Sequence, residues 1–180
     1  MGTPIRSIIR AATKDANSPY NVLMLLDPNN LDFISNLAST NNNFYFLGKV
    51  NDAKWNNPDI PKPENCFVLD CDDIPSHIDF DLVLCSNKGF FQFLKSLCDF
   101  WHLPLVVLEQ ETIQDEYKIT NQHEWSVLRT FQGDVNVFLS QEIRDSWGQM
   151  GYVIEENNPS FCDAWDNIFQ EASKLVYVRM

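Results

Sequence analysis

Short apolar runs alternate with polar segments along most of the chain. The first run is NVLMLL at residues 21–26, and the turn-forming pair Asp27-Pro28 follows it. A continuous apolar run of this length is typical of a strand that is buried on both faces. The Asp-Pro pair favours a turn. The pattern therefore predicts a first strand at residues 21–26, in the interior of a sheet.

Six further runs have the length and composition of strands. They are predicted at residues 43–48, 66–70, 80–86, 103–109, 133–140 and 151–156. Between them lie segments whose apolar residues recur every three or four positions, which is the period of an amphipathic helix. Helices are accordingly predicted at residues 31–38, 89–101, 121–131, 141–147 and 159–178.

Three of these helices carry further signals. Gly148 stands just past the helix at 141–147, where a glycine commonly ends a helix. The closing helix should pack on the sheet through one stripe, formed by Phe161, Trp165, Ile168 and Phe169. An aromatic stripe around the helix at 89–101 is expected in the core, and its members are Phe90, Phe91, Phe93, Phe100 and Trp101. His102, at the end of that helix, is expected to be structural.

Alternating strands and helices are the signature of a parallel sheet covered on both faces. We therefore expect an α/β fold, a single doubly wound Rossmann-like domain with a mostly parallel sheet of about six or seven strands. The first strand should be central, between the second and the fourth, because crossover connections are right-handed. A chain of 180 residues that is 44% hydrophobic has the size of one core. The domain is expected to span residues 21–180.

Residues 1–20 have no strand signal and are interpreted as an arm outside the sheet. Apolar and basic residues alternate in this segment, and the candidates for a partner contact are Ile5, Arg6, Ile8, Ile9 and Arg10. A domain with one core leaves no apolar segment to cover these isoleucines, whereas a neighbouring molecule would bury them. The arm is therefore predicted to bind a protein partner or a second copy of the chain.

The acidic charge of the chain limits its partners. The net charge is -12 and the sequence pI is about 4.5. Binding to nucleic acid or to anionic lipid needs clustered Lys and Arg, so neither partner is expected. No apolar run approaches the length of about 18 residues that a membrane span needs, and the first residues lack the apolar core of a signal peptide.

The five cysteines form no CxxC pair, and most fall within predicted strands or helices. They are interpreted as reduced thiols. The expected location is the cytoplasm, or a virus particle if the source is viral.

Three stretches bear a family resemblance in their order and spacing. They are IDFDLVLCSNKGFFQF, PLVVLEQE and GDVNVFLSQEIRDSWG. Together they resemble the N-terminal, acceptor-side half of a retaining glycosyltransferase of the GT-B, family-four type, which occurs in bacteria and their phages. The closing WDNIFQEAS is similar to the last helix of such enzymes, which crosses back onto the N-terminal domain. The resemblance implies a cleft at the carboxyl ends of the strands, lined by Asn87, Lys88, Glu109, Gln110 and Ser140.

The sequence departs from that family in two ways. GYVIEENNPSF leads almost directly into the closing helix, where family members continue into the domain that binds the nucleotide sugar. Gln110-Glu111 stands where relatives tend to carry His-Thr, and glutamine cannot act as an acid or base. We therefore expect a non-catalytic structural or partner-binding module. The alternatives are the acceptor-side subunit of a split glycosyltransferase, with a sugar acceptor as ligand, and an unrelated α/β hydrolase.

The run CFVLDCDDIP places Asp70, Asp72 and Asp73 after the third predicted strand. Such carboxylates suit a divalent metal site, a phosphatase nucleophile or a solvated turn. The turn is favoured, because GT-B sheets hold no metal there and no later segment completes a phosphatase set. No cofactor is expected, since DPNNLDF after the first strand lacks the glycines of a phosphate loop. Glu116 and Glu124 match the spacing of a family glutamate pair, which is interpreted as chance.

Overall fold

The computed structural model describes residues 19–25, 31–47, 59, 61–69, 78–86, 91–113 and 132–179, without the side chains of residues 31, 47, 91–94, 97 and 176–179. Several predictions made from the sequence lie outside these residues. They concern the arm up to residue 18, the helix at 121–131, the carboxylates Asp70, Asp72 and Asp73, the pair Glu116 and Glu124, and the cleft candidates Asn87 and Lys88.

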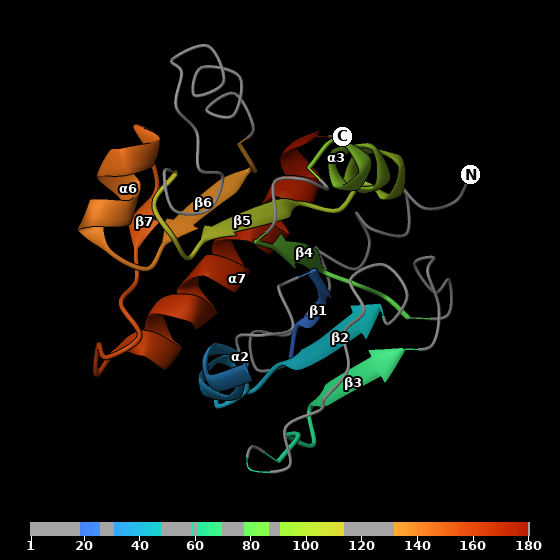
Figure 1. Cartoon of the computed structure of the whole chain (residues 1–180). Coiled ribbons are helices and arrows are strands. Elements are labelled where there is room, and N and C mark those ends of the chain that lie inside the picture. The colour runs from blue at the N-terminus through green and yellow to red at the C-terminus, as the bar shows by residue number, and fades with distance from the viewer. Residues whose placement is uncertain are drawn as a thin grey trace.

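The sheet has seven strands, all parallel, in the order β3-β2-β1-β4-β5-β6-β7 (Figure 1). The strands are β1 (Asn21–Leu25), β2 (Asn43–Leu47), β3 (Cys66–Leu69), β4 (Leu82–Cys85), β5 (Leu105–Glu109), β6 (Val135–Phe138) and β7 (Tyr152–Val153). Val22 of β1 is opposite Phe44 of β2 on one side and Leu82 of β4 on the other. The α/β fold and the central place of the first strand are thus confirmed. β7 is shorter than the six residues predicted, because only two of them pair with β6.

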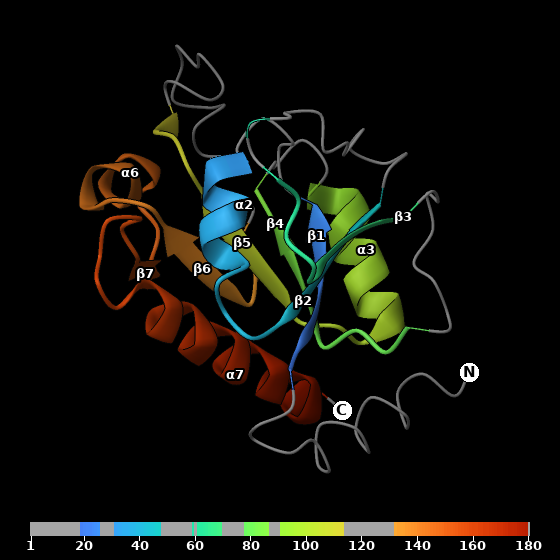
Figure 2. The ribbon, with the colours of Figure 1, turned by 90° about the horizontal axis from the view of Figure 1, so that it is seen from below.

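The described helices are α2 (Leu31–Leu37), α3 (Phe91–Trp101), α6 (Gln141–Trp147) and α7 (Phe161–Arg179). In Figure 2, α2 and α7 lie on one face of the sheet and α3 lies on the other. Side chains of β1 alternate between these layers, with Val22 and Met24 in the core under α2 and α7, and Leu23 and Leu25 in the core under α3. This two-sided burial is why the strand has no polar positions in its interior.

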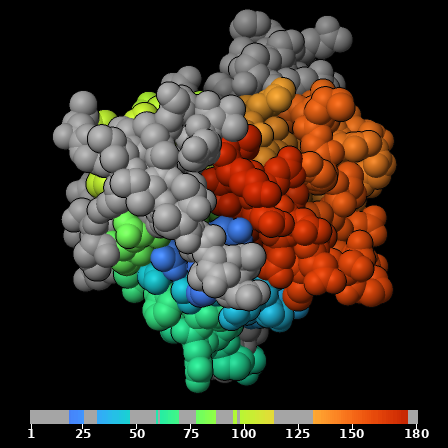
Figure 3. Space-filling view, turned by 180° about the vertical axis from the view of Figure 1, so that it is seen from behind, coloured from blue at the N-terminus to red at the C-terminus, as the bar shows by residue number. Residues whose placement is uncertain are grey.

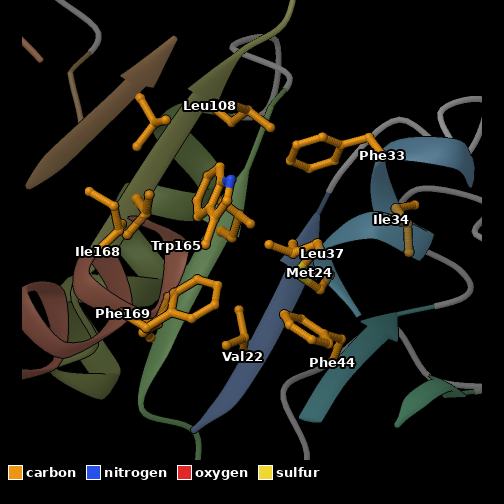
Figure 4. Close-up of a cluster of buried hydrophobic side chains, with 14 of the residues drawn as sticks. Val22, Met24, Phe33, Ile34, Leu37, Phe44, Leu108, Trp165, Ile168 and Phe169 are labelled. Atoms are coloured by element: carbon orange, nitrogen blue, oxygen red, sulfur yellow. The ribbon is translucent and has the colours of Figure 1, made fainter. Parts of the chain in front are cut away.

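The closing helix α7 packs as predicted. Phe161, Trp165, Ile168 and Phe169 are all buried. The Trp165 ring lies 5.9 Å from that of Phe33 on α2, and the Phe169 ring lies 6.1 Å from that of Phe44 on β2 (Figure 4). Figure 3 shows α7 in red, beside blue and cyan residues from the first part of the chain. The last helix therefore joins both halves of the sheet.

The side chains of Phe90, Phe91 and Phe93 lie outside those that the structure describes. The expected aromatic stripe of α3 is wrong at Phe100. This side chain is 62% exposed, whereas Cys98 is fully buried and Trp101 packs against the core under α3. Side chains two positions apart in sequence point roughly 200° apart around a helix. Phe100 therefore cannot share the buried face of Cys98. His102 ends the helix with φ 54, and the N–H of Leu103 donates to the carbonyl of Cys98 at 2.9 Å. His102 thus has the left-handed conformation that often closes a helix.

Candidate functional site

The carboxyl edge of an open parallel sheet is where its loops can form a ligand site, beside the point at which strand order reverses. Here that point lies between β1 and β4. Leu25 and Cys85 are opposite each other at the ends of these strands, and the N–H of Ser86 donates to the carbonyl of Leu25 at 3.2 Å. Ser86 is buried. It directly precedes the candidates Asn87 and Lys88.

The structure brings the other three cleft candidates together. Glu109, the last residue of β5, is opposite Phe138 of β6, and its carbonyl accepts a hydrogen bond of 3.2 Å from the N–H of Leu139. Gln110 follows Glu109, and Ser140 follows Leu139, so all three lie at the adjoining ends of two strands. Gln110 and Ser140 are partly buried, and Glu109 is only 1% exposed.

The side chain of Glu109 belongs to the α3 side of the sheet. Leu105 and Val107 pack in the core under α3, and strand side chains alternate with a period of two. Glu109 therefore continues that row at its carboxyl end. Ionising a carboxylate that is buried at this edge costs free energy unless polar groups lie nearby. Buried ionisable side chains of this kind are frequent in functional sites.

Ser140 forms the N-cap of α6. Its backbone is extended, with φ -155 and ψ 163, and its hydroxyl oxygen accepts from the N–H of Ile143 at 3.1 Å. At the other end Gly148 has φ 61, and its N–H donates to the carbonyl of Arg144 at 3.0 Å. The predicted glycine cap is thus confirmed. The hydroxyl of Ser140 has a structural task, because it satisfies an N–H that the helix itself cannot.

Trp147, the last residue of α6, holds the segment that follows β5. Its indole N–H donates to the carbonyl of Glu111 at 3.0 Å, and the side chain is fully buried. The neighbouring Ser146 hydroxyl accepts from the N–H of Ile113 at 3.1 Å. Ile113, Phe138 and Trp147 form a small apolar cluster beneath these bonds. Sequence reasoning missed this anchor, although a tryptophan directly before the Gly148 cap was a visible signal.

Two further carboxylates lie near each other at the carboxyl edge, one at the start of α2 and one in the turn after β7. Glu156 belongs to that turn, and Asp32 belongs to the first turn of α2. Partial desolvation by the surrounding protein raises the pKa of the exposed Glu156 carboxyl, and the negative charge of Asp32 raises it further. Two carboxylates from distant parts of the sequence therefore repel each other at this edge.

The described cysteines have the character of buried core residues. Cys66, Cys85 and Cys98 are buried thiols and Cys162 is partly buried. Burial raises the pKa of the Cys66 thiol to about 11, although the charge of Lys62 opposes this shift. Cys66 is therefore protonated at neutral pH and is a weak nucleophile.

Within the described residues, His, Cys, Asp and Glu side chains do not gather in a group of three or more that could hold a metal ion. The described helices likewise include none that is long and apolar enough to cross a membrane.

The chain matches no family model, no curated protein and no solved structure in comparisons with known proteins. The resemblance to glycosyltransferases therefore rests on the sequence motifs alone.

Proposed function

We propose that the chain is a glycosyltransferase-like, acceptor-side domain that serves as a non-catalytic, partner-binding module in a larger assembly, such as a phage particle. Its parallel sheet and the return of α7 onto β2 and α2 support the proposal, because the resemblance implies both. Many unrelated functions share this fold, so function depends on the residues at the carboxyl edge.

One observation carries the proposal: polar groups around the ends of β5 and β6 are engaged in holding the backbone. The Ser140 hydroxyl caps α6, the carbonyl of Glu111 accepts from Trp147, and the Ser146 hydroxyl accepts from Ile113. Catalysis instead requires groups that stay available to the reacting atoms. Gln110 supports the same conclusion, since its amide neither gains nor loses a proton near neutral pH and so cannot serve as a general acid or base.

The test is a calorimetric titration of the full-length protein with sugar nucleotides. We expect no binding heat with uridine or guanosine diphosphate sugars at millimolar concentration. A melting curve of the same sample would show that the protein is folded. A dissociation constant in the micromolar range would contradict the proposal.

The burial of Glu109 favours a second candidate function, the acceptor-side subunit of a split glycosyltransferase. The Glu109 carboxylate is buried at the carboxyl edge, and it could accept hydrogen bonds from sugar hydroxyls if ligand binding opened that edge. Simple glycosides would be titrated into the protein and followed by NMR. If the chain is an acceptor-side subunit, Glu109→Gln should abolish the chemical-shift changes that the glycoside causes. Glu142→Gln, a change at an exposed residue of α6, should leave them unchanged. Absence of glycoside-induced shifts in the wild-type protein would leave the module as the better proposal.

A further inference from the structure

Among the described strands β3 lies at one end of the sheet, so one of its sides pairs with none of them and forms an edge (Figure 1). On the other side it pairs with β2, where the N–H of Phe44 donates to the carbonyl of Asn65 at 2.8 Å. In a parallel ladder, successive residues direct their N–H and C=O groups to opposite sides of the strand. Asn65 and Phe67 therefore face β2, and Cys66 and Val68 face the edge.

The turn before β3 covers the first of these edge residues. The N–H of Cys66 donates to the carbonyl of Pro63 at 3.1 Å, and the ammonium group of Lys62 donates to the carbonyl of Cys66 at 2.7 Å. Both backbone groups that Cys66 directs to the edge thus have partners. Charged side chains, lysine above all, commonly protect edge strands from pairing with another chain.

The next two residues expose apolar surface on both faces of the strand. Phe67 is 39% exposed and Val68 is 40% exposed. Successive side chains point to opposite faces, so these two flank the edge from either side. The inner part of Phe67 stacks on Tyr45 of β2, with ring centroids 4.9 Å apart, which holds its ring in place.

We propose that the edge of β3 is a docking surface for β3 of a second copy of this chain, and that Lys62 holds it closed. In an antiparallel pair related by a two-fold axis at Val68, the two Val68 residues exchange both backbone hydrogen bonds. Phe67 then lies opposite Leu69 of the copy. Each cross-strand pair at the centre is apolar, so this strand is complementary to itself. That self-complementarity favours a second copy over an unrelated strand.

This surface is distinct from the carboxyl edge and from residues 1–20, so the inference goes beyond the proposed function and can fail independently of it. Docking must displace the ammonium of Lys62 from the carbonyl of Cys66. Removing that ammonium should therefore strengthen the association of two copies, although it adds no new contact.

The experiment is analytical ultracentrifugation of full-length protein over a range of concentrations. We expect Lys62→Met to raise the self-association constant about a hundredfold over wild type, because two charge-assisted hydrogen bonds, one in each copy, no longer have to break, and each corresponds to a factor of about ten. Lys95→Met is the matched control, because it removes a charge from α3, where Lys95 pairs with Asp99 at 3.1 Å. This control should behave as wild type. Lys62→Gln serves as a second variant if Lys62→Met does not fold.

A second change locates the contact. Adding Val68→Lys to Lys62→Met would oppose two like charges across the two-fold axis and should restore wild-type association. The proposal is wrong if the Lys62 variants associate no more strongly than Lys95→Met. It is equally wrong if the double variant associates as strongly as Lys62→Met, since association would then use another surface.

Discussion

Asp134 is hydrogen-bonded to both backbone groups of Leu105. Its N–H donates to the carbonyl of Leu105 at 2.8 Å, and its carboxylate accepts from the N–H of Leu105 at 2.8 Å. Asp81 makes the same two contacts with Asn21, each at 2.8 Å. Each aspartate precedes a strand and binds the first residue of the neighbouring strand. The two pairs therefore set the alignment of β6 with β5 and of β4 with β1.

Asp134→Ala should lower the free energy of unfolding by about 1–3 kcal/mol, because the N–H of Leu105 loses a charged acceptor. Urea denaturation measures this loss. Asp134→Asn retains an oxygen acceptor and should lose less. Asp99→Ala, at an exposed position of α3, is the control and should change stability little. Equal losses for the alanine and asparagine variants would show that the side-chain contact with Leu105 is not what matters.

Trp165→Ala should cost about 3–5 kcal/mol, because it removes a fully buried ring from the contact between α7 and α2. Trp165→Phe should cost less. It keeps an aromatic ring against Phe33 and removes an indole N–H that is buried and has no hydrogen-bond acceptor among the described residues. Thermal melting provides the comparison. A melting curve that does not change with Trp165→Ala would mean that this face of α7 does not stabilise the domain.

Gly151→Ala should destabilise the end of the sheet. A Cβ at this position would lie 2.5 Å from the carbonyl oxygen of Asn136 and 2.8 Å from the ring of Phe138, so β6 and the start of β7 would have to separate. Overpacking of this kind typically costs about 1–3 kcal/mol. Met150→Ala is the neighbouring control, since Met150 is 86% exposed. Chemical unfolding measures the free energy of unfolding of both variants. Equal values for Gly151→Ala and Met150→Ala would refute the predicted clash at residue 151.

Glu156→Gln should stabilise the protein at neutral pH. The folded state raises the pKa of Glu156, so its ionised form is disfavoured relative to the unfolded chain. Stability from this group is therefore lost as pH rises through the raised pKa and recovered as pH falls below the unfolded value. The variant should melt at a higher temperature than wild type at pH 7, and the difference should shrink when the pH is lowered to 4. A difference that is the same at both pH values would contradict the electrostatic explanation.

Deletion of residues 1–18 tests the proposed partner arm. Ile5, Ile8 and Ile9 are predicted to be buried by a neighbouring molecule, with Arg6 and Arg10 near its acidic residues. The shortened protein should remain folded and shift toward the monomer, or release its partner, in sedimentation. Unfolding, or an unchanged assembly state, would remove the main support for the partner-binding proposal.

Much of the fold was determined by local patterns. Seven apolar runs correspond to seven strands, and the stripe from Phe161 to Phe169 predicted the buried face of α7. A strand buried on both faces leaves a continuous apolar run, and a helix buried on one face leaves apolar residues every three or four positions, so these features need no knowledge of distant contacts. The cap at Gly148 was readable for the same reason, because a helix end depends on a few adjacent residues.

Only the tertiary structure decided which residues meet. Trp147 binds a carbonyl 36 residues away, and no local period encodes that contact. The same holds for Glu109 and Ser140, which approach each other because β5 and β6 pair in one particular register. The exposure of Phe100 could not be predicted from its residue type either, since an aromatic residue is buried only if its side of the helix faces the sheet. Strand order and register determine these contacts, and they arise from the packing of the whole chain.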